Sequence, residues 1–139
     1  MLHPLMIEAT RKLISLYKAA TVEKITELQQ QTTLMIYPWF PLWVVREQLT
    51  RVAGSCVLCT AARKIVGHAD ETPCTACIHY LVTGCGCMTD SVSWDLLVNA
   101  NTAEELWVAM QGRAAYLESL LDLAPKVEEL AHVLEENKC

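Results

Sequence analysis

The sequence predicts a mainly α-helical fold, a small helical domain of about five to six helices with a zinc-binding, cysteine-rich segment in its middle. Apolar residues recur at helical spacing through both ends of the chain, no run of confident strand length is present, and six cysteines cluster in residues 56–87. A chain of 139 residues, 53% of them hydrophobic, is one domain's worth with a sizeable core. We therefore expect a single domain over 1–139, made of N-terminal helices over 1–53, a zinc-binding segment over 54–90 and C-terminal helices over 91–139.

Two helices are expected before residue 36. Met6 and Tyr17 can share one apolar helical face, and Pro4 is acceptable in the first turn of that helix. Thr21 is a suitable N-cap for a second helix that runs on to about Met35.

Residues 36–43 break the helical pattern, because two prolines three positions apart exclude a regular helix. This segment holds the only phenylalanine and two of the four tryptophans. The favoured interpretation is a hydrophobic corner packed over the core, and the alternative is an exposed aromatic patch. The candidate partner-binding residues are Trp39, Phe40 and Trp43.

A third helix is expected from Leu42 to about Val52, with Gly54 ending it and Ser55 capping the next element. After the cysteine segment, Ser91 or Ser93 can begin a short helix.

Thr102 and Glu105 form a capping box before a long helix, and Pro125 is expected to start a last helix. The apolar stripe of the long helix is Leu106, Met110, Leu117 and Leu121.

The pairs Cys56–Cys59 and Cys74–Cys77 have the Cys-x-x-Cys spacing that aims two sulfurs at one point, and two such pairs complete the four-sulfur shell of one structural zinc ion. Cys56 and Cys59 are the firm pair, and Cys85 and Cys87 are alternates that compete with Cys74 and Cys77 for the other two places.

Which two cysteines join Cys56 and Cys59 therefore stays open, and His68 and His79 are within reach in sequence. Buried reduced cysteines used as small hydrophobes and an iron–sulfur cluster are the weaker alternatives.

No catalytic constellation stands out, so a non-enzymatic protein is expected. Pro73 and the cysteines after it match half of the zinc-deaminase signature, but His68 lies too close in sequence to sit on a separate helix. A cysteine–histidine nucleophile pair, such as Cys85 with His79 or His132, stays a minor alternative.

The charge distribution disfavours a nucleic-acid partner. The net charge is −5, and the last third, residues 101–139, has eight acidic against three basic residues. No secretory signal and no apolar run of membrane-spanning length is visible, so a cytoplasmic protein without a membrane partner is expected. A nucleic-acid-binding zinc-ribbon-like domain and a small cysteine or zinc enzyme remain the alternative functions.

The cysteine motifs, with Trp94 and the acidic helix around residues 116–121, resemble small bacteriophage-encoded cysteine-cluster proteins over roughly residues 43–122. The motifs are Cys56–Arg63, Cys74–Cys77 and Thr83–Cys87. This resemblance implies a small accessory protein, acting in the host cytoplasm, that binds and inhibits a host protein complex. Inhibitors of host defence of the anti-CRISPR type belong to that category.

Overall fold

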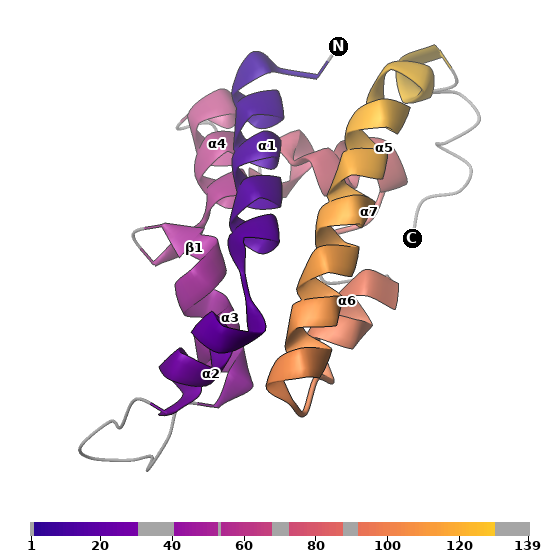
Figure 1. The fold of residues 1–139 in the computed structure, drawn as a ribbon. Coiled ribbons are helices and arrows are strands. Elements are labelled where there is room, and N and C mark those ends of the chain that lie inside the picture. The colour runs from indigo at the N-terminus through magenta and orange to yellow at the C-terminus, as the bar shows by residue number, and fades with distance from the viewer. Residues whose placement is uncertain (1, 31–40, 53, 68–72, 88–91, 130–139) are drawn as a thin grey trace.

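The structure is a computed structural model that describes residues 2–30, 41–52, 54–67, 73–87 and 92–129. These residues form seven α-helices, one 3₁₀ helix and one two-stranded hairpin, so the fold is mainly helical as expected (Figure 1). In chain order the elements are α1 (Pro4–Ala19), α2 (Val22–Gln30), α3 (Leu42–Thr50), β1 (Arg51–Val52), β2 (Ser55–Cys56), α4 (Val57–Val66), η1 (Pro73–Ala76), α5 (Ile78–Thr83), α6 (Val92–Val98) and α7 (Ala103–Glu129).

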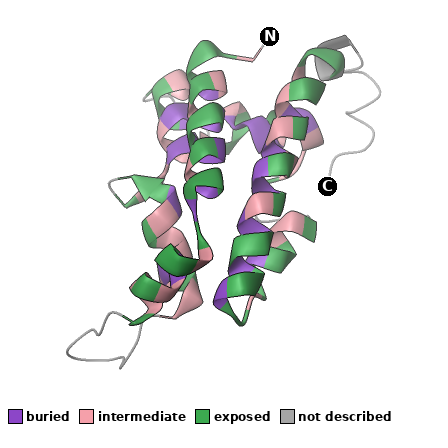
Figure 2. Cartoon of the chain, viewed as in Figure 1, coloured by how far each residue is buried: buried purple, intermediate pink, exposed green. Residues whose placement is uncertain are grey.

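The long helices α1 and α7 lie side by side and run in opposite directions, with α4 packed on α1 and α6 packed on α7 (Figure 1). Buried and exposed residues alternate along α7, as a helix with one core-facing stripe requires (Figure 2). The side chains of Met6, Leu106, Met110 and Leu117 are fully buried and belong to one continuous hydrophobic core. The predicted stripe of the long helix is thus the face that holds the fold together.

The ends of α1 and α2 follow the local rules predicted from the sequence. Pro4 stands in the first turn of α1, where the backbone N–H it lacks would have no helical partner. The Thr21 hydroxyl accepts the Lys24 N–H at 3.0 Å, so Thr21 caps α2. Met35 and the aromatic residues Trp39 and Phe40 lie outside the described residues.

The third helix is shorter than predicted, because α3 ends at Thr50 and Val52 belongs to strand β1. Strands β1 and β2 pair antiparallel, with Arg51 opposite Cys56. Gly54 turns the chain between them at φ +78°, a conformation that other residues rarely adopt. Ser55 is consequently a strand residue and not a cap, and Cys56 is the N-cap residue of α4.

The capping box at the start of α7 is confirmed. The Glu105 N–H donates to the Thr102 hydroxyl at 3.1 Å, and a Glu105 carboxylate oxygen accepts the Asn101 N–H at 2.8 Å. The short helix predicted around Ser93 is α6, which begins at Val92.

The prediction that Pro125 starts a separate helix is wrong, because Pro125 lies inside α7. Inside a helix proline removes one backbone hydrogen bond, and because Pro125 lies four residues from the end of α7, this loss falls in the final turns. Residues 130–139 lie outside the described part of the chain. None of the described helices is long and apolar enough to cross a membrane.

Replacing Leu117 by alanine is expected to lower the free energy of unfolding by about 2–5 kcal/mol, because Leu117 is fully buried between the helices. Leu123→Ala, on the same helix but 44% exposed, is the matched control and should cost about 0.5 kcal/mol or less. Urea unfolding followed by far-ultraviolet circular dichroism measures both. Equal losses in the two variants would contradict the predicted role of this stripe.

Candidate functional site

One small cavity of about 20 Å³, which His79 also lines, brings together four of the predicted cysteine ligands: Cys59, Cys74, Cys77 and Cys87. They come from three separate segments, namely the first turn of α4, the turn of η1, and the residues after α5. A cavity of this size has room for one water-sized occupant. The structure therefore brings distant parts of the cysteine segment to one point.

Cys56 lies beside this group, on a larger cleft of about 180 Å³ that Cys59, Cys77 and Cys87 also line. The five cysteines named here are free thiols. Cys85, one of the predicted alternates, is disulfide-bonded. Its sulfur is therefore not a free thiolate, whereas the prediction of Cys85 as an alternate metal ligand requires one.

Local turns place these sulfurs. The Cys77 N–H donates to the Cys74 carbonyl at 3.1 Å, which closes the tight turn predicted for a Cys-x-x-Cys pair. Helix α5 then ends at Gly84 in the left-handed conformation, at φ +78°. This reversal, reinforced by the Cys85 N–H donating to the Thr83 hydroxyl at 3.1 Å, brings Cys87 back toward the start of α5.

Burial raises the pKa of the Cys77 thiol to about 12. The pKa values of Cys59 and Cys87 are also raised, chiefly by burial and further by the neighbouring cysteines. Thiols in such surroundings stay protonated at neutral pH and are poor nucleophiles unless a cation compensates the charge of the thiolates. Within the described ranges no group of three or more His, Cys, Asp or Glu side chains has metal-holding geometry as it stands.

His79 is buried beside the cysteines, but its ring is engaged elsewhere. An Arg113 Nη lies 3.3 Å from His79 Nε2, and because a guanidinium can only donate, Nε2 is the acceptor and the ring is neutral. Burial, helped by the Arg113 charge, lowers the pKa of His79 to about 3. His79 is thus held by Arg113 through Nε2, and His68 lies outside the described residues.

Arg113, which the sequence motifs did not single out, is a buried arginine with 3% of its surface exposed. Its guanidinium donates to the Ser93 hydroxyl at 2.8 Å and to the Cys87 carbonyl at 3.2 Å. It also lies over the rings of Trp94, at 5.6 Å, and Tyr116, at 4.9 Å. One side chain thereby joins α5, α6, α7 and the segment that carries Cys87.

A signal for Arg113 was present in the sequence. Position 113 falls three residues after Met110 and four before Leu117, so it belongs to the apolar stripe of the long helix. A charged residue on such a stripe is buried with the stripe and needs polar partners there.

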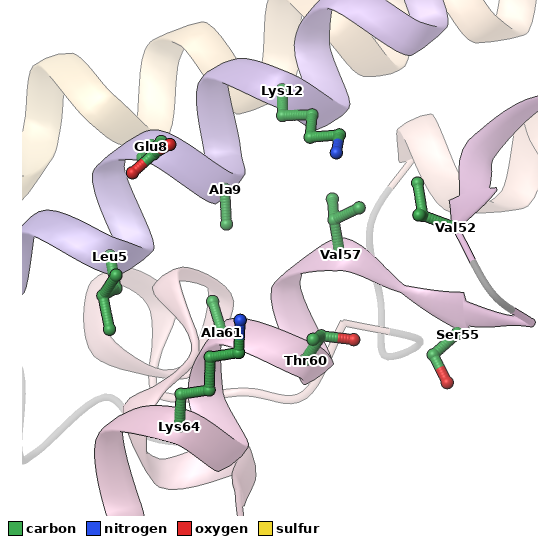
Figure 3. A pocket seen from close by; sticks show the side chains of 10 residues that line it. All are labelled: Leu5, Glu8, Ala9, Lys12, Val52, Ser55, Val57, Thr60, Ala61 and Lys64. Carbon is green, nitrogen blue, oxygen red and sulfur yellow. The ribbon is translucent and has the colours of Figure 1, made fainter.

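A separate hollow, of about 420 Å³, lies between α1, α4 and the β1–β2 hairpin (Figure 3). We call it the α1–α4 groove. Its floor contains the small side chains of Ala9 and Ala61, and Lys12 from α1 faces Lys64 from α4 across it (Figure 3). Leu5, 39% exposed, stands at its rim. The groove is therefore apolar at the bottom and mainly cationic at the edge, where Glu8 is the one acidic lining residue among those described.

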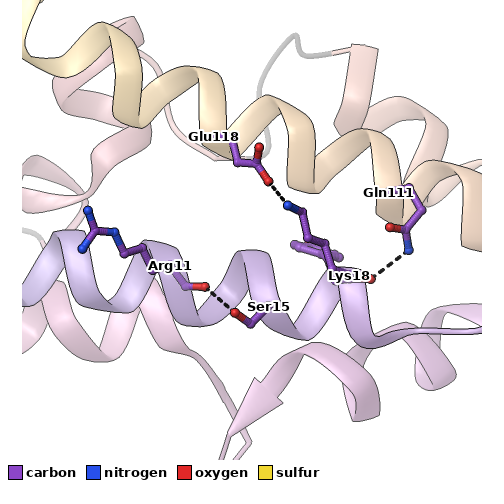
Figure 4. A network of polar contacts seen from close by, with 6 residues as sticks. Arg11, Ser15, Lys18, Gln111 and Glu118 are labelled. Carbon is purple, nitrogen blue, oxygen red and sulfur yellow. Dashed lines mark hydrogen bonds and ion pairs between the residues drawn. The ribbon is translucent and has the colours of Figure 1, made fainter.

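Another face of α1 is fixed to α7 by polar contacts (Figure 4). Lys18 forms an ion pair with Glu118, and the Gln111 side chain donates to the Tyr17 carbonyl at 3.1 Å. These contacts fix α1 in place as one wall of the α1–α4 groove.

Of the predicted partner-binding residues, only Trp43 is among the described ones, and its side chain is 54% exposed at the start of α3. It is not part of the cysteine cluster or of the α1–α4 groove. The structure thus leaves three separate features: the thiol cluster, the groove and an exposed tryptophan.

No family model, curated protein or solved structure matches the chain. The resemblance to phage-encoded cysteine-cluster proteins stays a prediction.

Arg113→Lys is expected to lower the free energy of unfolding by about 1–3 kcal/mol, because an ammonium cannot reproduce the planar fork that reaches Ser93 and the Cys87 carbonyl together. Arg11→Lys, at an exposed position of α1, is the control and should change stability by about 0.5 kcal/mol or less. Chemical denaturation measures both variants. A tolerated lysine at position 113 would show that the fork geometry is not required.

Proposed function

We propose that this protein is a non-enzymatic binding protein whose central segment is held by one structural zinc ion. The observation that carries the proposal is the gathering of five free thiols, Cys56, Cys59, Cys74, Cys77 and Cys87, around one junction of the fold. Thiolates are the ligands that zinc prefers in closed structural sites. When bound, the ion would supply the charge that lets these buried thiols ionise together.

The zinc would stabilise the fold and take no part in a reaction. A four-sulfur shell leaves no open position for substrate, and metal-binding free energy becomes folding free energy when the ligands come from distant segments. Cys59, Cys74 and Cys87 belong to three such segments, of which η1 is a single turn that can contribute little stability by itself. Joining them through one ion would fix η1 and the end of α5 against α4.

The α1–α4 groove is the binding face that the geometry favours. Its exposed aliphatic rim and small-residue floor suit the side chains of a protein segment, and Lys12 and Lys64 favour acidic residues at the edges of that segment. We therefore propose a protein partner that offers aliphatic side chains flanked by carboxylates. The exposed Trp43 would extend the contact surface or serve a second partner.

Two observations disfavour the alternative functions. Arg113 is buried, and Arg46 lies 5.2 Å from the Trp94 ring centre, so these two cations do not build an open phosphate-binding surface. For a cysteine enzyme, Cys85 is disulfide-bonded, and the pKa of Cys77 is raised, whereas catalytic cysteines have lowered values. Inhibition of a host defence complex stays a prediction of the resemblance.

Purified protein is expected to contain about one zinc per chain by elemental mass spectrometry. Removing the metal with a strong chelator under reducing conditions should lower the melting temperature by several degrees, and adding zinc back should restore it. Magnesium is the control: it binds thiolate ligands poorly and should not restore the melting temperature. Metal-free protein that melts at the same temperature with or without zinc would contradict the structural zinc.

The groove is tested with a random peptide library panned on the full-length protein. Enriched peptides should combine aliphatic and acidic residues, and a Lys12→Glu/Lys64→Glu variant should bind them at least about 10-fold more weakly, because both rim charges are reversed. Lys24→Glu/Lys126→Glu makes the same charge change at exposed positions outside the groove and should bind nearly normally. Basic peptides, or equal loss in both variants, would contradict this binding face.

A further inference from the structure

The proposed zinc ion has two possible ligand sets in this structure, and the cavities separate them. Cys74 lines the small cavity but not the cleft, whereas Cys56 lines the cleft but not the small cavity. Cys59, Cys77 and Cys87 line both. The two Cys-x-x-Cys pairs that the sequence singled out therefore divide between two spaces, and three ligands are common to either choice.

We infer that the zinc ion is held by Cys59, Cys74, Cys77 and Cys87, and that Cys56 is a fifth thiol outside the ligand set. This inference rests on the structural zinc proposed above and adds the identity of its ligands. It departs from the sequence-based prediction, because Cys87 replaces Cys56, a member of the pair that the sequence favoured most, and not Cys74 or Cys77.

The sizes of the two spaces support this choice. The small cavity of about 20 Å³ holds one water-sized occupant, which matches a single ion among four sulfurs. The cleft of about 180 Å³ is several times larger and reaches Leu13 and Tyr17 on α1, so sulfurs on its walls would have more space to close.

Backbone structure also separates Cys56 from the others. Cys56 is paired with Arg51 in the β1–β2 hairpin before it caps α4, so its position is set by the hairpin. Cys74 and Cys77 share one tight turn, and the Cys87 carbonyl is held by Arg113. Three of the four proposed ligands, Cys74, Cys77 and Cys87, are thus supported by turns and contacts beside the small cavity itself.

The surrounding charges complement a zinc ion bound by four thiolates, which carries a net charge of −4 + 2 = −2. The Arg113 guanidinium donates to the Cys87 carbonyl at 3.2 Å, which places one buried cation beside the proposed site.

Cobalt substitution tests the ligand set in the full-length protein. Co²⁺ bound by four thiolates gives strong sulfur-to-metal charge transfer in the near ultraviolet, and Cys74→Ser and Cys87→Ser should each lower its intensity per bound cobalt by about a quarter. Cys56→Ser should keep the wild-type spectrum and bind zinc within about 2-fold of wild type, because no ligand is lost. Loss of charge transfer in Cys56→Ser together with a normal spectrum in Cys74→Ser would overturn the inference.

A second measurement needs no variant and therefore does not depend on whether the serine variants fold. The wild-type protein is labelled with N-ethylmaleimide, and the modified cysteines are mapped by mass spectrometry. Zinc should protect Cys59, Cys74, Cys77 and Cys87 relative to metal-free protein and leave the labelling rate of Cys56 unchanged. Protection of Cys56 by zinc would overturn the inference. If neither zinc nor cobalt binds the wild-type protein, the structural zinc itself fails, which is a different result from binding through another set of sulfurs.

Discussion

The Arg113 guanidinium is buried where α5, α6 and α7 meet, and its need for partners determines how these elements are placed. Burying an arginine costs several kcal/mol unless hydrogen bonds replace its water. The Ser93 hydroxyl, the His79 ring and the Cys87 carbonyl supply acceptors from three parts of the chain. Moving one of these acceptors would break its hydrogen bond to the guanidinium. The positions of α5, α6 and α7 are therefore set here by directed hydrogen bonds as well as by apolar burial.

The same contact connects the core to the cysteine cluster. Because Arg113 holds the carbonyl of Cys87, the residues after α5 cannot move away from α7 without breaking a charged hydrogen bond. Arg113 also occupies Nε2 of His79, a residue that lines the small cavity together with the four cysteines. The guanidinium thus engages one nitrogen donor beside the site, although Arg113 lines the neighbouring cleft and not the small cavity.

Much of the fold follows from local sequence signals, and the exceptions have physical reasons. Pro4, Thr21 and the Thr102–Glu105 capping box act within one turn of their own position, so the sequence alone places the helix starts they control. Val52 departs from the predicted helix because it pairs with Ser55 in the two-stranded hairpin around Gly54. The spacing of apolar residues cannot predict such a pairing, because it depends on a second strand.

The site was predictable in its residue types but not in its grouping. The Cys-x-x-Cys spacing singled out Cys56, Cys59, Cys74 and Cys77 as candidate ligands, and the last three line the small cavity. Whether Cys56 or Cys87 accompanies them depends on how α5 and its terminal turn pack against α4, which is a tertiary property. The disulfide at Cys85 is likewise something that spacing cannot reveal, because disulfide connectivity is not readable from sequence alone.

Helix α4 links the cysteine cluster to the α1–α4 groove, because it contributes side chains to both. Cys59 and Ala62 line the small cavity, while Ala61 and Lys64 line the groove. A rotation of α4 about its axis would move both sets together, and with about 100° between successive residues even a shift of one position would turn Lys64 away from Lys12. A metal ion that fixes Cys59 against η1 and Cys87 would therefore also fix the spacing of the two lysines across the groove. On this reasoning a bound zinc ion would act on binding at a distance, by fixing the rotation of the one helix that the two sites share.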